Sequence, residues 1–203
     1  MKIEQAIEIL KKRVKKVYNK SRCQVAKRIY RGHSANMSAA IENEIALFLQ
    51  SILPKNYEFY IDPSIKIDKT HRPDILIIDN KKNVKAIIEL KSNMGYCRNA
   101  KEVLNKLKSI HNIFIKEKHL ICSFSLKDES DKSITKKIFY PKNTKCFFVI
   151  YTGRNCPEKY HKNNRKIAKK KELKYFILFN EGYDNSQKCE IEQFANEIKQ
   201  ICK

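Results

Sequence analysis

The sequence predicts a mixed α/β (α+β) fold in which helices flank a central sheet, and three features lead to this prediction. Short apolar runs rich in β-branched and aromatic residues, which are typical of buried strands, recur along the chain. Amphipathic segments, with apolar residues three and four positions apart, lie before, between and after these runs. A polar stretch of five residues, 79–83, separates two apolar runs and predicts a β-hairpin.

The chain length favours one domain. Its 203 residues are enough for a well-formed core and too few for two full domains. We therefore expect a single domain over 1–203. It consists of a basic N-terminal helix and loop (1–36), a core that carries the candidate site (37–126), and C-terminal strands and helices that complete the sheet (145–203).

The charge of the chain indicates a polyanionic partner. Lysine and arginine number 43 against 22 aspartates and glutamates, which gives a net charge of +21. Nucleic acid releases its counterions when lysines and arginines replace them, so DNA is the first candidate partner. A membrane is disfavoured, because Trp is absent and no apolar run approaches the ~20 residues of a spanning helix.

The cysteines predict a reduced, cytoplasmic protein. There are seven of them, scattered and without any Cys-x-x-Cys pair, so neither a disulfide framework nor a zinc site is expected. The N-terminus contains Glu4 and Glu8 and no cleavage-site pattern, which argues against a signal peptide.

The N-terminal segment predicts an amphipathic helix of about five turns. Ile3, Ile7, Leu10, Val14 and Val17 recur at helical spacing, with lysines and arginines between them. The simpler interpretation is that this stripe covers the core and the basic face is solvated. A pairing helix, or one that flanks bound DNA, is the alternative that the spacing allows.

A second helix is predicted over 38–53 and is ended by Pro54. Glu42 and Glu44 flank its apolar stripe on opposite borders, so at least one of them can face inward. Alternatively, both are solvated carboxylates that the positive end of the helix dipole favours.

The remaining elements follow from the same patterns. A surface excursion is expected at 127–137, which is polar. The densest basic run is 159–174, which is either a solvated face or a segment that follows a phosphate backbone. The strands are expected at 57–61, 65–67, 75–78, 84–90, 120–126, 146–151 and 175–179, and the later helices at 99–115 and 189–202.

The predicted hairpin gathers charge at one end of two apolar strands. Asp74 precedes its first strand, and Glu89 and Lys91 lie at the end of its second. In an antiparallel pair these positions are neighbours, and residues two apart lie on one face of a strand. Burying such charges is unfavourable unless they are paired or used.

This set of residues suits phosphodiester hydrolysis assisted by Mg²⁺, with Mn²⁺ as a possible substitute. The reaction needs an activated water and neutralisation of charge on the phosphoryl oxygens, and a divalent cation held by oxygen ligands supplies both. Asp74 and Glu89 supply carboxylates, and the backbone carbonyl of Leu90 adds a third oxygen. Apolar surroundings and a nearby metal are expected to lower the pKa of Lys91, which would hold or deprotonate the water.

The motif resembles that of a known family. Pro73–Asp74, followed after fourteen residues by Glu89–Leu90–Lys91, is similar to the PD-(D/E)xK motif of the restriction-endonuclease-like nucleases. The preceding stretch SAAIENEIALFL resembles the glutamate-bearing first helix of that superfamily. The resemblance implies an αβββαβ core with a mixed central sheet, Mg²⁺-dependent cleavage of phosphodiester bonds and a homodimer.

The resemblance also favours Glu42 over Glu44 as the helix carboxylate. The family glutamate is followed by small or apolar residues four and seven positions later, and Ala46 and Leu49 satisfy this for Glu42. Glu44 would need Ser51 at the second of these positions, so it is kept in reserve.

The sequence therefore predicts a Mg²⁺-dependent endodeoxyribonuclease of restriction or defence type. The alternatives are a structure-selective nuclease that acts on junctions or in repair, and a nucleic-acid-binding module on the same fold that does not cut. No second DNA-binding domain is evident, so specificity would come from this domain, a dimer partner or a further subunit. The residues that could contact the DNA backbone, each of which could equally be a plain surface charge, are Arg72, Arg98, Lys101, Arg165 and Lys169.

Overall fold

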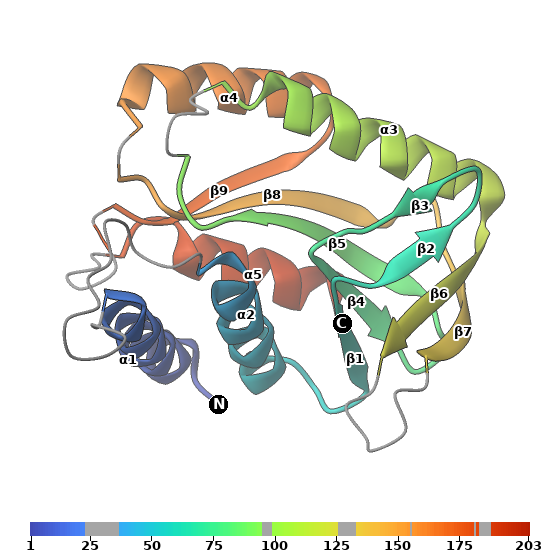
Figure 1. Ribbon diagram of the computed structural model, residues 1–203, viewed down its shortest axis with the longest axis horizontal. Helices are drawn as coiled ribbons and strands as arrows, with labels where there is room; N and C mark the ends of the chain where they lie inside the picture. Colours follow the sequence, from blue (N-terminus) through green and yellow to red (C-terminus); the bar gives the residue numbers. More distant parts are fainter. Residues whose placement is uncertain (23–36, 95–98, 126–132, 155, 181, 183–187) are drawn as a thin grey trace, which may run out of the picture.

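The computed structural model describes residues 1–22, 37–94, 99–125, 133–154, 156–180, 182 and 188–203, and Figure 1 shows their arrangement. The helices are α1 (Ile3–Arg22), α2 (Ser38–Ile52), α3 (Lys101–Glu117), α4 (Glu158–Lys170) and α5 (Ile191–Ile201). The strands are β1 (Tyr57–Ile61), β2 (Ser64–Lys66), β3 (Thr70–His71), β4 (Ile75–Asp79), β5 (Val84–Lys91), β6 (His119–Ser125), β7 (Ser133–Phe139), β8 (Lys145–Thr152) and β9 (Lys174–Phe179).

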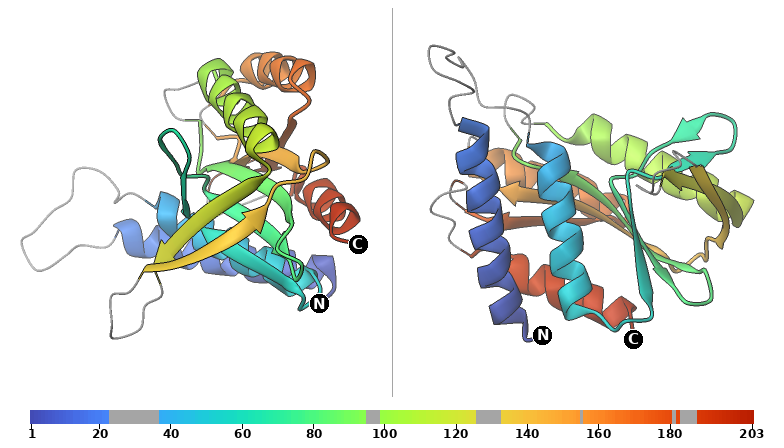
Figure 2. Two further views of the ribbon diagram at one scale, coloured as in Figure 1. Left: turned by 90° about the vertical axis from the view of Figure 1, so that its right-hand side faces the viewer. Right: turned by 60° about the horizontal axis from the view of Figure 1, so that its bottom comes forward.

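A mixed five-stranded sheet forms the centre of the molecule, in the order β1-β4-β5-β8-β9. The pairs β1–β4 and β4–β5 are antiparallel, whereas β5–β8 and β8–β9 are parallel. Figures 1 and 2 show α1, α2 and α5 on one face of this sheet and α3 and α4 on the other. The predicted fold class, a mixed α/β fold with a central mixed sheet between helices, is confirmed.

A second sheet, in the order β3-β2-β6-β7, packs beside α3. Its inner side chains, among them Ile65, Cys122 and Ile138, join the apolar cluster on the α3 face of the central sheet. The hairpin loop of the central sheet ties the two sheets together, because the carbonyl of Lys82 accepts a 2.8 Å hydrogen bond from the Phe139 N–H.

The predicted surface excursion at 127–137 is wrong for its second half. Residues 133–139 form β7, which pairs with β6 from Ser133 to Phe139. The strand was hidden by its lysines, since only Ile138 among its described side chains is fully buried and Lys136 and Lys137 dominate the composition. The first half, 127–132, lies outside the described residues.

The N-terminal helix covers the core, in agreement with the simpler of the two interpretations. Ile7, Leu10 and Val14 are fully buried in the cluster formed with α2 and α5. Strands β8 and β9 and helix α5 agree with the elements predicted at 146–151, 175–179 and 189–202, and most of the basic run 159–174 forms α4. Its lysines are exposed, while His161, Asn164 and Ala168 face the core.

Strand β5 divides its side chains between the two faces of the sheet. Ala86, Ile88 and Leu90 belong to the cluster under α1, α2 and α5. Ile87 belongs to the cluster under α3 and α4, and Glu89 and Lys91 continue this face because side chains alternate along a strand. No helix among the described residues has the length and apolar character needed to cross a membrane.

Replacing Ile88 with alanine tests the central sheet as the core of the fold. Ile88 is fully buried, so we expect Ile88→Ala to lower the free energy of unfolding by about 3 kcal/mol, through lost burial and the cavity left behind. The measurement is urea denaturation followed by circular dichroism. Ile121, which is 55% exposed on the second sheet, is the matched control, and Ile121→Ala should change stability by less than ~0.5 kcal/mol. Equal losses in both variants would contradict the assignment of the core.

Candidate functional site

Three carboxylates lie in one row across the ends of three strands. Strand β4 is antiparallel to β1 and to β5, and its register with both is fixed at its first residue, Ile75. One position further out, Asp62 follows β1, Asp74 precedes β4 and Glu89 lies in β5. The N–H of Asp62 donates to the carbonyl of Asp74 at 2.9 Å, which fixes the first two of these neighbours.

The carboxylate of Asp74 replaces a backbone partner of β5. Its Oδ2 accepts the N–H of Leu90 at 2.5 Å, just beyond the point where the β4–β5 ladder ends. The N–H and C=O of one strand residue point to the same side. We therefore infer that the Leu90 carbonyl also faces the Asp74 edge, on the side where the sequence predicted a metal ligand.

Lys91 is paired with Glu89 on the same face of β5. Its Nζ donates to Oε1 of Glu89 at 2.8 Å, and the Glu89 side chain is 17% exposed. Burial alone would lower the pKa of Lys91, but the negative charges of Glu89, Asp74 and Glu42 outweigh it and the pKa is raised. The expected lowering is therefore wrong for the protein without a cation, because these carboxylates stabilise the ammonium form.

Glu42 reaches the same group from α2, on the other face of the sheet. Burial raises its pKa from 4.5 to about 7, and the charges of Asp74 and Asp62 act in the same direction. Burial likewise raises the pKa of Asp74 from 3.8 to about 6, and the charge of Glu89 adds to this. These mutual effects show that the carboxylates lie within electrostatic reach of one another.

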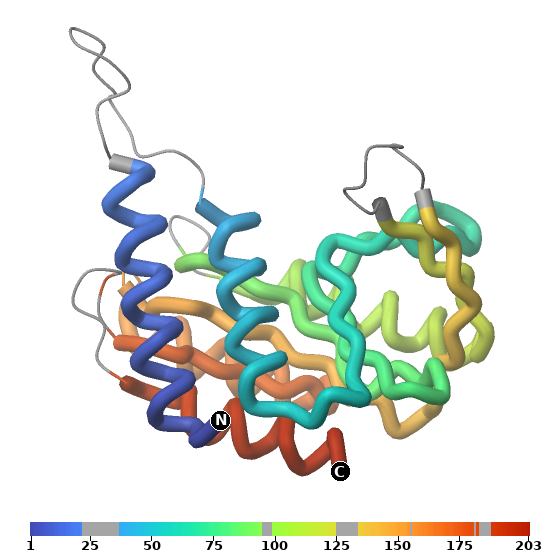
Figure 3. The backbone as a smooth tube through the Cα atoms, turned by 90° about the horizontal axis from the view of Figure 1, so that it is seen from below, coloured from blue at the N-terminus to red at the C-terminus, as the bar shows by residue number. Residues whose placement is uncertain are grey.

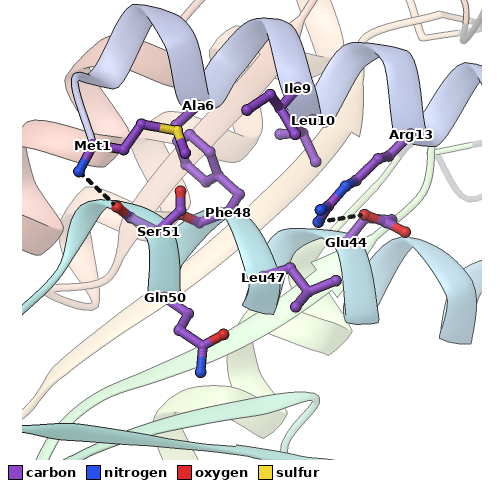
Figure 4. A pocket seen from close by; sticks show the side chains of 10 residues that line it. All are labelled: Met1, Ala6, Ile9, Leu10, Arg13, Glu44, Leu47, Phe48, Gln50 and Ser51. Atoms are coloured by element: carbon purple, nitrogen blue, oxygen red, sulfur yellow. Dashed lines mark hydrogen bonds and ion pairs between the residues drawn. The ribbon is translucent and has the colours of Figure 1, made fainter. Parts of the chain in front are cut away.

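Glu44 faces away from this group, towards α1. Its carboxylate lies 3.7 Å from the guanidinium of Arg13. Figure 4 shows the two side chains pointing toward each other between α1 and α2. Both side chains line a hollow of about 270 Å³ between α1 and α2, together with Met1, Leu47 and Phe48. Of the two glutamates that the sequence left open, the structure brings Glu42 to the hairpin and not Glu44.

The donor set fits a hard divalent cation, although it is not gathered into a finished coordination shell. Within the described ranges, no three side chains of His, Cys, Asp or Glu converge closely enough to form a metal-binding group. Burial is the main cause of the raised pKa values of Glu42 and Asp74, and repulsion by the neighbouring carboxylates adds to it. A divalent cation would relieve this repulsion. The residues that could hold it are Asp74, Glu89, Glu42 and the backbone of Leu90.

Asp62 is the residue of this group that the sequence did not single out. The sequence pattern places it in a turn, yet its charge acts on both Glu42 and Asp74. Its backbone has a φ of 47°, in the left-handed region that aspartate tolerates better than most residues. The sequence holds no local signal for this position, because Asp62 lies beside Asp74 only through the pairing of β1 with β4.

The predicted contacts to the DNA backbone occupy different surroundings. Arg72 is exposed and lies two positions before Asp74, and Lys101 and Lys169 are exposed on α3 and α4. Arg165 is already engaged, because its guanidinium forms an ion pair with Glu190 and lies 5.5 Å from the centre of the Tyr175 ring. Arg98 lies outside the described residues.

Comparison with known proteins supports the fold. No family model matches the chain, and no curated protein matches it. A solved structure of NucC from P. aeruginosa ATCC27853, in its cAAA-bound form, is similar with a TM-score of 0.50 and 12% sequence identity. The match covers 98% of this chain and 88% of that one. The fold is therefore restriction-endonuclease-like, as the hairpin motif implied.

The raised pKa of Asp74 predicts that the site destabilises the protein when no cation is bound. Because the pKa of Asp74 is higher in the folded state than in the unfolded state, its ionisation lowers the free energy of unfolding as pH rises from about 4 to above 6. Asp74→Asn keeps an acceptor for the Leu90 N–H and removes the charge. In EDTA at pH 8 this variant should be more stable than the parent by up to ~2 kcal/mol, and at pH 4 the difference should vanish.

Asp79 provides a control of opposite sign at the other end of the hairpin. Burial would raise its pKa, but hydrogen bonds from Asn83 and Lys81 lower it overall. Asp79→Asn should therefore reduce stability at pH 8. Chemical denaturation of both variants at the two pH values is the measurement, and a stability loss at pH 8 in Asp74→Asn would contradict the prediction.

Proposed function

We propose that this protein is a Mg²⁺-dependent endonuclease that hydrolyses DNA phosphodiester bonds, of restriction or defence type, with Mn²⁺ as a possible substitute. The single observation that carries the proposal is that Asp74, Glu89 and Lys91 lie at one end of the hairpin, within electrostatic reach of Glu42 on α2. The restriction-endonuclease-like fold supports it. The geometry and the motif point to the same chemistry.

Each residue has a distinct role in the proposed reaction. The bound cation supplies positive charge at the phosphoryl oxygens and favours ionisation of water. Asp74, Glu89 and Glu42 would hold it, and the hydrogen bond from the Leu90 N–H orients the Asp74 carboxylate. Lys91, held by Glu89, presents an ammonium group that binds the attacking water or stabilises charge on the phosphate.

The proposed substrate is DNA, and the proposed assembly is a cytoplasmic homodimer to which a further subunit could add specificity. The net charge of +21 supports a polyanionic substrate. The scattered cysteines of the sequence, without any Cys-x-x-Cys pair, support a reducing compartment. A structure-selective nuclease has the same chemistry and remains the alternative within the enzyme class.

A binding module that does not cut is the second candidate. Such a module would have no use for a group of carboxylates that repel one another and that burial disfavours. It would also bind DNA equally well with and without a divalent cation. The two candidates therefore differ in both cleavage and cation dependence.

Cleavage of plasmid DNA in Mg²⁺ tests the proposed roles through a matched pair on one helix. Glu42→Gln should lower the rate by ~100-fold or more, because it removes a ligand charge from the site. Glu44→Gln, two positions further along α2 and facing Arg13, should cut at the parental rate. Asp74→Asn and Lys91→Ala should be impaired like Glu42→Gln. The proposal would be overturned if the parent protein did not cut in Mg²⁺ or Mn²⁺, or if Glu42→Gln and Glu44→Gln cut at equal rates.

DNA binding should depend steeply on salt and on exposed cations near the site. Arg72→Ala should weaken binding and reduce the slope of log K against log[salt] by about one, if Arg72 neutralises one phosphate. Arg13, which forms an ion pair with Glu44 between α1 and α2, is the control, and Arg13→Ala should leave the slope unchanged. Fluorescence anisotropy with labelled duplex in Ca²⁺ measures both. Identical slopes for the two variants would exclude Arg72 as a phosphate contact.

A further inference from the structure

The two edge strands of the central sheet, β1 and β9, differ in whether another segment covers their outer side. At β9, residues 188–190 cover the outer edge: the N–H groups of Cys189 and Glu190 donate to Leu178 and Ile177 at 3.0 and 2.9 Å. The carboxylate of Glu190 accepts the Ile177 N–H at 2.7 Å. At β1, no strand or segment of the described chain pairs with the outer side. An uncovered edge strand is a template for pairing with another strand.

The residues of β1 that offer this edge can be identified from the site itself. The Asp62 N–H bonds to β4, and in an antiparallel pair alternate residues point their N–H and C=O groups to the same side. Tyr60 and Glu58 therefore face β4. Tyr57, Phe59 and Ile61 direct their backbone groups outward, and in the described part of the chain these groups have no hydrogen-bonding partner on that side.

Apolar surface borders this edge on both faces of the sheet. Leu47 is 43% exposed and Ile61 36%, and both line a hollow of about 430 Å³ between α2 and β1. A second hollow, of about 530 Å³, lies towards Phe124 and Lys136 of the second sheet. Figure 3, seen from below, shows β1 between α2 and the second sheet. The edge thus combines free backbone groups with side chains that gain from burial.

We propose that β1 pairs with β1 of a second copy of this chain, antiparallel and centred on Phe59, so that the two central sheets become one continuous sheet. The sequence of β1, YEFYI, has apolar residues at both ends and at its centre. In the proposed register Tyr57 lies opposite Ile61 of the second copy, and Glu58 lies opposite Tyr60. Within one chain the Tyr60 hydroxyl donates a hydrogen bond to the Glu58 carboxylate. The same two side chains, placed opposite each other across the two copies, can form the same kind of hydrogen bond.

Neighbouring registers are disfavoured by charge. A shift by two residues in one direction places Glu58 opposite Glu58 of the second copy, and a shift in the other direction places it opposite Asp62. Like charges directly opposite each other destabilise a strand pair. The register centred on Phe59 avoids both and pairs all five residues of the strand. This self-complementarity favours a second copy over an unrelated strand.

The pairing has a consequence for the proposed sites. Residues directly opposite in an antiparallel pair point to the same face, so both copies would present Asp74, Glu89 and Lys91 on one face of the continuous sheet. The two Asp62 residues would lie ~20 Å apart along the strands, since each is three positions from the centre. The inference extends the proposed homodimer to a named surface, and its test requires neither cleavage nor DNA.

Sedimentation equilibrium of the full chain, in EDTA and without DNA, tests the proposal. We expect a monomer–dimer equilibrium in which dimer increases with protein concentration and with salt, because two strongly basic copies repel each other less when screened. Ile61→Lys should abolish the dimer, since it adds charge at the edge. Ile121→Lys changes an exposed isoleucine on the second sheet in the same way and should dimerise like the parent.

Hydrogen exchange distinguishes strand pairing from other modes of association. In the dimer, the amides of Tyr57, Phe59 and Ile61 should exchange at least ~10-fold more slowly than in the monomer. A parent protein that stays monomeric at all salt and protein concentrations, a dimer that survives Ile61→Lys, or a dimer with unprotected edge amides would each overturn the proposal. Should Ile61→Lys fail to fold by circular dichroism, Leu47→Lys, at the adjacent hollow, replaces it, and a dimer that survives this change would equally overturn the proposal.

Discussion

The candidate site depends on one hydrogen bond, from the N–H of Leu90 to the carboxylate of Asp74. Strand β4 begins one residue after Asp74, so the end of β5 extends beyond the antiparallel ladder, and no described strand lies beside it on that side. Asp74 satisfies the first orphaned donor, and burial of the backbone makes such a partner necessary. The same bond holds Asp74 next to Glu89. A structural requirement of the sheet end therefore places two carboxylates side by side.

The candidate site is locally rich in negative charge, whereas the chain as a whole is strongly positive. The protein has a net charge of +21, yet Glu42, Asp62, Asp74 and Glu89 lie within electrostatic reach of one another, and the positive charge of Lys91 acts on both Glu42 and Asp74. Dispersed positive charge attracts a polyanion over long distances, whereas a local excess of carboxylates at the strand ends would repel its phosphates. A divalent cation would resolve this conflict, because the carboxylates would attract it and it would bind phosphate oxygens. The carboxylates would therefore favour binding of the phosphate groups only together with a divalent cation.

The sequence predicted the parts of this site that depend on local spacing, and missed those that depend on register. Asp74, Glu89 and Lys91 follow from a hairpin with a five-residue loop, which pairs the start of one strand with the end of the next. Asp62 was missed because its position depends on the β1–β4 register, and no local signal fixes that register. The pKa of Lys91 moved opposite to expectation because the sum of three nearby charges outweighs burial. Strand β7 was hidden because two adjacent lysines, Lys136 and Lys137, lie on its opposite faces and interrupt the apolar pattern.

The proposed interface follows from the same register as the site. The hydrogen bond from Asp62 to Asp74 decides which residues of β1 turn their backbone groups towards β4. A slip of β1 by one residue would separate Asp62 from Asp74 and would also exchange the inward and outward sets, leaving Glu58 and Tyr60 at the free edge. The edge and the carboxylate row are therefore coupled through a single strand. A dimer formed at this edge would stabilise the register on which the carboxylate row depends, and pairing and site geometry would reinforce each other.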